Sequence, residues 1–294
     1  MEGTEIRCAI EGHVATVTLD GPRKLNAVTQ QSIDDLFAAL DTVDRDDAVR
    51  AVVVTGAGRA FCAGTDLADG FALPAGGDPV TGDGVPADVG AKVALRLFRM
   101  NKPVIGAING PAVGFGASVI LPMDIRVCSS AASFGYVFVR RGIVAESCSS
   151  WFLPRIVGIA TATEWMMTGR MVGADEALRR GLVHETTAPD ALVPRAMQIA
   201  TDIAANGAPV SIALTRQLLW RMLGADHPAV AHGYESRALV ATLGLPDVEE
   251  AMSAFREKRS PRFAGSASRN DLPSAWWPDA TRSESASGPS RKEK

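Results

Sequence analysis

The stretch "AVVVTGAGRAFCAGTDL", residues 51–67, leads from a run of strand-forming residues into a turn of small ones. "AVVVT" is uncharged and rich in valine, which is typical of a strand buried on both faces. The glycines of "GAG" end that strand, and "CAGT" then follows without a bulky side chain before Asp66. Backbone N–H groups at a strand exit are unpaired, and small residues let a ligand oxygen approach them. The stretch therefore predicts a buried strand whose exit can bind a ligand.

A second strand exit repeats this arrangement. "KPVIGAING", residues 102–110, ends in glycine and leads to a helix that begins near "GFGAS", residues 114–118. Two N–H groups that converge from two such turns form an oxyanion hole. Glycine turns also occur at ordinary sheet edges, so this pattern alone leaves a structural and a catalytic interpretation open.

The first third of the chain predicts an α/β fold. Residues 5–19 alternate in hydropathy and are interrupted by "EGH", which indicates a hairpin. A helix that Thr29 or Gln30 opens comes next, followed by the strand of residues 51–55. This order indicates ββα or βα repeats with mostly parallel, buried strands. Residues 68–90, which are rich in glycine, proline and aspartate, predict a long surface loop.

Helical patterns dominate the later part of the chain. "AESCSSWFLPRIVG" predicts a helix that opens at Glu146 or Ser147, and Asp124 is expected at the junction of a helix and a strand. From about Thr161, apolar residues recur at steps of three and four, as in amphipathic helices. We expect three parts: a core of ββα repeats over residues 1–200, a helical region over 201–263, and a flexible tail over 264–294.

Composition argues against several classes of protein. The 294 residues include 30 basic and 33 acidic ones, and a net charge of −3 gives no reason to expect nucleic-acid or membrane binding. We find no basic and apolar leader and no run of 18 apolar residues, so we expect neither a signal peptide nor a membrane span. The cysteines show no metal-ligand spacing, which favours a cytoplasmic protein without a metal site; they are Cys8, Cys62, Cys128 and Cys148.

Several motifs, in the same order along the chain, resemble those of the crotonase, or enoyl-CoA hydratase/isomerase, superfamily. They are "PRKLNAV", "GAGRAFCAGTDL", "NKPVIGAINGPAVGFGASVILPMDIRVCSSAASFG" and "TGRMVGADEALRRGLVHE", and the likeness extends over about residues 5–263. The resemblance implies a spiral of ββα turns with a helical C-terminal region that mediates trimer formation, as a homotrimer or a dimer of trimers. It implies an acyl-CoA thioester as substrate and no cofactor other than the coenzyme A that the substrate carries.

The same resemblance implies which residues form the site. In this superfamily two backbone N–H groups stabilise the enolate of the thioester, and by position they belong here to Thr65 and Phe115. Phe115 replaces the usual glycine, so its side chain must either point away from the thioester or narrow the acyl channel. The residues at the positions of the coenzyme A contacts are Lys24, Asn26, Ala27, Ala63, Asp66 and Leu67. From the sequence alone, Lys24 is more readily interpreted as a solvated loop residue, and Asp66 as a residue that fixes its turn.

The reaction depends on carboxylates, and the two expected in a hydratase of this superfamily are missing. Ser118 and Phe138 occupy their positions, and neither side chain is a general base at neutral pH. Ser118 could contact the substrate or simply face the core. Glu146 lies eight residues beyond Phe138, in a run "E-x-C-S-S" that resembles the Δ3-Δ2-enoyl-CoA isomerase branch. There, one glutamate moves a proton between carbons 2 and 4 of the acyl chain.

Glu146 also has a purely structural interpretation. Glutamate is common in the first turn of a helix, where the helix dipole lowers its pKa, whereas apolar neighbours such as Trp151 and Phe152 would raise it. The sequence does not decide between these effects. We expect a double-bond isomerase that uses Glu146, with two alternatives: an enoyl-CoA hydratase with an atypical site, and a non-catalytic acyl-CoA-binding homologue.

Overall fold

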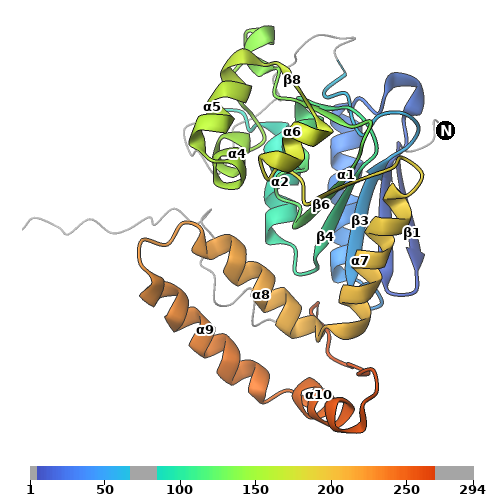
Figure 1. Cartoon of the computed structure of the whole chain (residues 1–294), viewed down its shortest axis with the longest axis vertical. Helices are drawn as coiled ribbons and strands as arrows, with labels where there is room; N and C mark the ends of the chain where they lie inside the picture. The colour runs from blue at the N-terminus through green and yellow to red at the C-terminus, as the bar shows by residue number, and fades with distance from the viewer. Residues whose placement is uncertain (1–4, 67–84, 269–294) are drawn as a thin grey trace, which may run out of the picture.

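The computed structural model describes residues 5–66 and 85–268 (Figure 1). Within these residues one six-stranded sheet has the order β1-β2-β3-β4-β6-β9. β1 and β2 form an antiparallel hairpin, and every later neighbour in the sheet is parallel. The strands are β1 (Ile6–Glu11), β2 (Val14–Leu19), β3 (Ala51–Gly56), β4 (Val104–Ile108), β6 (Ile125–Ser129) and β9 (Glu185–Thr187). The expected hairpin and the mostly parallel sheet are therefore confirmed.

Helices cover both faces of this sheet, which explains why the valine-rich strand is buried throughout. Alternate residues of a strand point to opposite faces, and accordingly Val52 and Val54 pack toward α1 (Gln30–Arg45) and α2 (Val89–Arg99). Val53 packs on the other face against α7 (Leu192–Asn206). α7 presents small residues to the sheet at four-residue steps, so it lies close to the strands; they are Ala196, Ala200 and Ala204.

A smaller sheet and four helices complete the body beside the main sheet. Within the described residues this sheet has the order β5 (Ala112–Val113), β7 (Ser133–Gly135), β8 (Met171–Gly173). Short 3-10 helices cover Pro22–Lys24 and Phe138–Arg141. The four helices are α3 (Phe115–Val119), α4 (Ser149–Val157), α5 (Ile159–Thr168) and α6 (Ala174–Arg179). Figure 1 shows α4, α5 and α6 grouped on one side of the main sheet, above α2.

The C-terminal helices extend away from this body. They are α8 (Pro209–Met222), α9 (Pro228–Leu243) and α10 (Pro246–Glu257), and α8 and α9 lie side by side (Figure 1). None of the described helices is long and apolar enough to cross a membrane.

One buried ion pair attaches α8 to the body. Arg216 Nε donates to Asp124 Oδ2 at 2.8 Å, and their side chains are only 4% and 17% exposed. The same guanidinium donates to carbonyls at the C-terminal end of α2, including that of Leu97 at 2.6 Å. Asp124 also accepts the indole N–H of Trp220 and the backbone N–H of Val104, both at 2.7 Å. Asp124 is thus the junction residue that the sequence predicts, and it also anchors α8.

Two helix starts differ from those expected. α4 begins at Ser149 rather than at Glu146 or Ser147, because Ser147 (φ 55°) and Cys148 (φ 57°) have left-handed backbones that no α-helix can include. α2 begins at Val89, inside the loop predicted for residues 68–90, and Asp88 caps it. Residues 67–84 lie outside the described residues.

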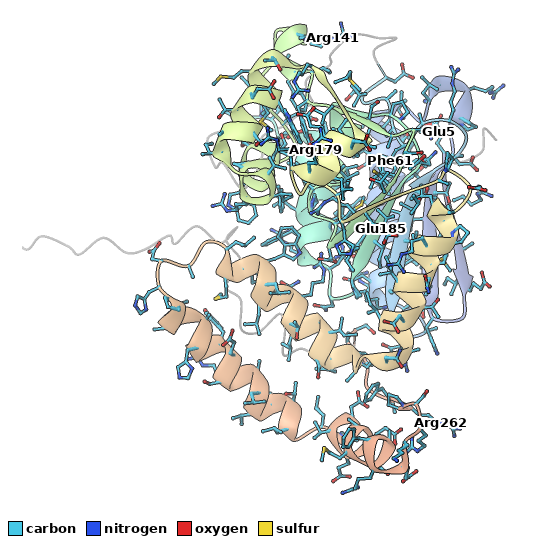
Figure 2. The ribbon with its side chains drawn as sticks, viewed as in Figure 1. Glu5, Phe61, Arg141, Arg179, Glu185 and Arg262 are labelled. Carbon is cyan, nitrogen blue, oxygen red and sulfur yellow. The ribbon has the colours of Figure 1, made fainter. Side chains whose placement is uncertain are left out.

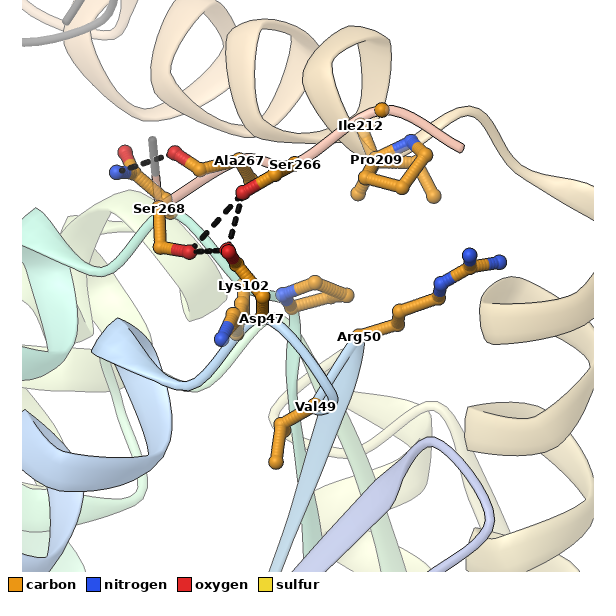
Figure 3. Close-up of a pocket in the computed structure, with 12 residues that line it drawn as sticks. Asp47, Val49, Arg50, Lys102, Pro209, Ile212, Ser266, Ala267 and Ser268 are labelled. Atoms are coloured by element: carbon orange, nitrogen blue, oxygen red, sulfur yellow. Dashed lines mark hydrogen bonds between the residues drawn. The ribbon is translucent and has the colours of Figure 1, made fainter. Parts of the chain in front are cut away.

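The segment expected to begin a flexible tail makes polar contacts. The N–H groups of Ala264 and Gly265 donate to Asp247 at 3.0 and 3.1 Å. The hydroxyls of Ser266 and Ser268 then contact Asp47, beside Arg50 and Lys102 (Figure 3). Backbone donors and hydroxyls of residues 264–268 thus find carboxylate acceptors on α10 and on the body, and the flexibility of the tail stays a prediction. The remainder of the predicted tail, 269–294, lies outside the described residues.

The anchor between α8 and the body yields a stability prediction. Asp124→Ala leaves the buried Arg216 guanidinium without its counter-charge, so we expect the free energy of unfolding to fall by about 3–5 kcal/mol. Glu185→Ala is the control, because it breaks an ion pair with Arg195 whose side chains are 34% and 35% exposed (Figure 2), and we expect a loss below about 1 kcal/mol. Urea denaturation followed by circular dichroism measures both, and equal losses would contradict the anchoring role.

Candidate active site

The two strand exits that the sequence singles out lie side by side. The N–H groups of Phe61 and Cys62 both donate to Pro111 O, at 3.0 and 3.1 Å. The N–H of Val113 donates back to Cys62 O at 2.9 Å. These bonds align the turn after β3 with the turn after β4. The residues that follow the two turns, Gly64 and Gly114, are therefore neighbours in space.

Each turn then passes through a glycine in a conformation that side chains disfavour. Gly64 has φ 102°, and Gly114 has φ 54° with ψ −120°, which is essentially restricted to glycine. A Cβ built on Gly64 would lie 2.9 Å from Val113 O and 3.9 Å from Gly114 Cα, so the two backbones touch. Any side chain here would separate the next residues, Thr65 and Phe115.

Thr65 and Phe115 keep free backbone donors at this contact. Within the described part of the chain, neither N–H donates a hydrogen bond. Val28 and Thr65 form a parallel bridge, in which the Val28 N–H donates to Gly64 O and the Asp66 N–H donates to Val28 O, both at 2.8 Å. This pairing leaves the N–H of Thr65 outside the ladder. Phe115 is the first residue of α3, where an N–H has no acceptor within the helix. Two unpaired donors on adjoining turns can bind the oxygen of a thioester.

The carboxylate of Glu146 and the side chain of Phe115 both lie beside Gly90. An ideal Cβ on Gly90, in the first turn of α2, would be 3.1 Å from Glu146 Oε2 and 3.1 Å from Phe115 Cδ2. The Phe115 ring is buried, and packs against α2 at this point. The start of α2, the start of α3 and the loop before α4 therefore meet at Gly90, beside the carboxylate of Glu146.

The environment of Glu146 favours its protonated form. Burial raises the pKa of its carboxyl to about 8, and the neighbouring negative charge of Asp88 acts in the same direction. Glu146 Oε1 is buried and has no hydrogen-bond partner among the described residues. α4 begins three residues later, so Glu146 does not lie in the first turn of that helix, where the sequence had placed it.

Asp88 was not among the residues that the sequence singled out, because it lies within the predicted loop. Its Oδ1 accepts the N–H of Gly90 at 2.9 Å, which caps α2, and its Oδ2 accepts the N–H of Ser147. The available signal was an aspartate immediately before the helical series Val89, Val93 and Leu97, which is a typical N-cap position. The contact with Ser147, 59 residues away, had no local signal.

The two positions where a hydratase would carry glutamates are buried. Ser118 lies in α3, and its Oγ has no partner within residues 5–66 and 85–268. Phe138 begins the second 3-10 helix and packs into the main core. Neither brings a carboxylate near Glu146. Arg140 Nε bonds to Thr168 O at 2.7 Å, and Arg141 lies at the outer edge of the molecule (Figure 2).

The residues predicted to contact coenzyme A lie in two adjoining loops. The Ala63 N–H donates to Leu25 O at 3.0 Å, which joins the loop around Lys24 and Ala27 to the turn after β3. Lys24 Nζ lies 2.8 Å from Glu5 Oε1 and 3.5 Å from Asp66 Oδ2, so its charge is already compensated by two carboxylates. Leu67 lies outside the described residues.

Asn26 has a structural role in these loops. Its side chain is buried, and its Nδ2 donates to the carbonyls of Ala57 at 2.9 Å and Ala60 at 2.8 Å. Its Oδ1 accepts the N–H of Gly21 at 3.0 Å. The Asn26 side chain is thus fully engaged in holding the loop, and only its backbone could face a ligand.

Comparison with known proteins fits this geometry. The family model for enoyl-CoA hydratase/isomerase matches residues 9–266. The chain belongs to the enoyl-CoA hydratase/isomerase family. It is 40% identical over 251 residues to the enoyl-CoA hydratase ACTT3 of Alternaria alternata, a match that covers 85% of this chain and 82% of the relative.

Two solved structures of the family extend the likeness to the fold. An enoyl-CoA hydratase from Bacillus anthracis has a TM-score of 0.80 and 29% identity, over 89% of this chain and 99% of that one. A monofunctional enoyl-CoA isomerase from M. smegmatis has a TM-score of 0.66 and 31% identity, over 78% of this chain and 99% of that one. The superfamily and the α/β crotonase fold expected from the sequence motifs are thereby confirmed.

Members of the enoyl-CoA hydratase/isomerase family act on acyl-CoA thioesters. The described residues contain no cluster of three or more side chains that could hold a metal ion. The site residues named from the resemblance keep the status of predictions. What the geometry adds is their arrangement: Thr65 and Phe115 adjoin, and Glu146 lies against the Phe115 side.

Gly90 gives a sharp test of this arrangement. A Cβ there would lie 2.0 Å from Ser147 Oγ, so Gly90→Ala must displace Ser147 and with it Glu146. We expect turnover of an enoyl-CoA substrate to fall by about 10²-fold, because a small misplacement of a catalytic group has effects of that size. Gly233→Ala, at an exposed position of α9 with open space around it, is the control and should retain full activity. Full activity of Gly90→Ala would contradict the placement of Glu146.

Proposed function

We propose that this protein is an enoyl-CoA isomerase that shifts a double bond with Glu146 as its single acid and base. The observation that carries the proposal is the position of Glu146: a buried carboxyl, with an unpaired oxygen among the described residues, beside the start of α3. The two positions that would supply the carboxylates of a hydratase hold Ser118 and Phe138 instead. One shuttling carboxyl suits isomerisation, whereas hydration requires two groups around one water.

The proposed reaction starts with ionised Glu146, which removes a proton from carbon 2 of a 3-enoyl-CoA. The electron pair of that C–H bond delocalises over the double bond and the thioester, giving a dienolate with its negative charge on oxygen. Glu146, now a carboxylic acid, returns the proton to carbon 4, and the double bond then lies between carbons 2 and 3. No atom is gained or lost, so no co-reactant is required.

The dienolate oxygen needs donors that are already in place before charge develops. The N–H groups of Thr65 and Phe115 fit this role, because both are unpaired within the described residues and the glycines that precede them are in contact. Preorganised donors of this kind are worth about 10²–10³-fold in rate each. Lys24, Ala27, Ala63 and Asp66 then lie on the side where the coenzyme A portion would extend, and the acyl chain would face Glu146.

A carboxyl with a pKa near 8 is suited to both halves of this reaction. A general base is most effective when its pKa is close to the working pH, since the same group must take up and release the proton. At neutral pH most of the free enzyme would hold Glu146 protonated, and the ionised fraction would grow as the pH approaches 8.

We place the protein in the cytoplasm on the sequence alone.

The competing function is enoyl-CoA hydration, which the name of the relative from Alternaria alternata favours. It would need a second acid or base that the positions of Ser118 and Phe138 do not supply. A third possibility is an acyl-CoA-binding homologue without turnover. The three differ in what happens to hydrogen at carbons 2 and 4.

Deuterium incorporation distinguishes these functions. In deuterated water with a 3-enoyl-CoA, we expect the 2-trans isomer to form, with deuterium at carbon 2 or 4 and no net hydration. Glu146→Gln removes the base while keeping its shape, so conversion should fall by about 10³-fold or more. Mass spectrometry and thioester absorbance measure both.

The other results have defined meanings. Net hydration of crotonyl-CoA that survives Glu146→Gln would reject the isomerase in favour of the hydratase. Thermal stabilisation by coenzyme A thioesters without deuterium uptake would reject both enzymes in favour of the binding homologue. Asp34→Asn, a change at an exposed carboxylate paired with Lys92, controls for the loss of one charge.

We further propose that the C-terminal helices assemble the chain into a homotrimer or a dimer of trimers. α9 supports this, because Ala238 is its one buried residue while several large apolar side chains are exposed. An exposed apolar face of this kind is a typical protein–protein contact surface. The exposed residues on α9 and α10 include Leu239, Val240, Leu243, Met252 and Phe255.

Val240→Asp tests the assembly. Val240 is 73% exposed in the single chain, so a charge there should not affect its fold but should break an apolar contact between copies. We expect light scattering after size-exclusion chromatography to show trimers or larger species for the wild type and monomers for the variant. Val193→Asp, at an exposed position of α7, is the control. A monomeric wild type would contradict the proposal.

A further inference from the structure

The loop that carries Glu146 is strained. Ser147 and Cys148 are consecutive non-glycine residues with left-handed backbones, φ 55° and 57°. Such residues cost free energy, and they persist only where surrounding contacts hold them. They are also the two residues directly after Glu146, so the contacts that hold them decide where its carboxylate lies.

Asp88 provides a polar contact to this loop from a distant segment, in addition to the local bonds of the Ser149 N–H and hydroxyl to Glu146 O at 3.0 and 2.6 Å. Its Oδ2 accepts the Ser147 N–H, while its Oδ1 accepts the Gly90 N–H at 2.9 Å. One carboxylate therefore joins the start of α2 to the strained loop. Gly90 allows the close approach, because any side chain there would occupy the space of Ser147 Oγ. Both oxygens of Asp88 therefore accept a hydrogen bond, one from α2 and one from the loop, and together these bonds fix the orientation of the carboxylate.

Few other charged groups bear on Glu146. On α2, just beyond Gly90, Lys92 Nζ is 2.6 Å from Asp34 Oδ1 and so is directed toward α1. At the start of α4, Cys148 is a neutral thiol whose pKa is raised by burial and then by the charges of Asp88 and Glu146. On α3 the facing group is the Phe115 ring. Asp88 is the charge that acts on Glu146 within the described residues.

We propose that Asp88 is a positioning residue for the reaction: it fixes the strained loop that presents Glu146. Its negative charge lies close enough to raise the pKa of the Glu146 carboxyl as well. The expected effect of Asp88 on the reaction rate rests on the proposed isomerase function. Its expected effect on the Glu146 carboxyl rests on the contacts alone. Asp88 does not touch the substrate in this proposal. It makes Glu146 a stronger base and keeps its carboxylate beside the start of α3.

Asp88→Asn is the informative substitution. Asparagine caps a helix as well as aspartate does, so α2 should still begin at Val89. The amide has no charge and only one acceptor oxygen, so it cannot accept both the Gly90 and the Ser147 N–H groups in the same geometry. Asp88→Ser, which also caps a helix and carries no charge, is a second variant in case one does not fold. Asp46→Asn is the matched control, because Asp46 Oδ1 likewise accepts the N–H two residues on, from Ala48, at 2.9 Å.

Two measurements on the full chain test the proposal. The first is ¹³C NMR titration of labelled glutamate carboxyls, with the Glu146 signal assigned by its absence in Glu146→Gln. In wild type we expect a midpoint near pH 8, and in Asp88→Asn a midpoint lower by about one pH unit or more. The second is the pH profile of isomerisation, whose midpoint in kcat/KM should shift down with it. At high pH, kcat should fall at least about tenfold with KM nearly unchanged. Asp46→Asn should match the wild type in both.

Each outcome has one meaning. An unchanged Glu146 midpoint in both folded Asp88 variants would overturn the proposal. A lowered midpoint with an unchanged high-pH kcat would reject the positioning role. If wild type shows no isomerisation at all, the proposed function fails, and the NMR titration still decides whether Asp88 controls the Glu146 carboxyl.

Discussion

The hydrogen bonds between the turn after β3 and the turn after β4 are the constraint on which the site depends. Phe61 and Cys62 donate to Pro111 O, and Val113 donates to Cys62 O. Parallel strands bring their carboxyl ends to one edge of a sheet, but they do not by themselves align the loops beyond those ends. These three bonds do, and the contact of Gly64 with Gly114 then leaves the N–H groups of Thr65 and Phe115 on adjoining backbones. Both the fold and the proposed chemistry use this alignment.

Local sequence patterns predicted the elements that depend on local physics. The valine run of β3 is buried on both faces because helices cover the sheet, and the interruption at "EGH" is the turn between β1 and β2. The strand exits and their glycines were also identified correctly. Chemistry at Ser118, Phe138 and Glu146 could be assigned to positions only through the resemblance to a family.

The errors share one cause, which is contact between distant segments. α4 starts late because Ser147 and Cys148 take left-handed conformations, and the Ser147 N–H donates to Asp88, 59 residues earlier. Distant contacts also involve the first residues expected in the tail, from which Asp47 accepts hydrogen bonds. For the same reason, the sequence could not decide whether the pKa of Glu146 is raised or lowered. Burial, and then the charge of Asp88, raises the pKa of Glu146, and both depend on residues distant in the sequence.

The buried Arg216 has a further consequence when it is considered together with α2. Arg216 bonds the last carbonyls of α2, while Asp88 and Gly90 lie at the first turn of the same helix. α2 has 11 residues and is therefore about 16 Å long. A helix of this length transmits displacement along its axis with little loss, since its backbone hydrogen bonds run parallel to that axis. The C-terminal helices and the loop of Glu146 are therefore connected through α2: in the proposed assembly, a shift of α8 would also displace the N-terminal end of α2, where Asp88 lies.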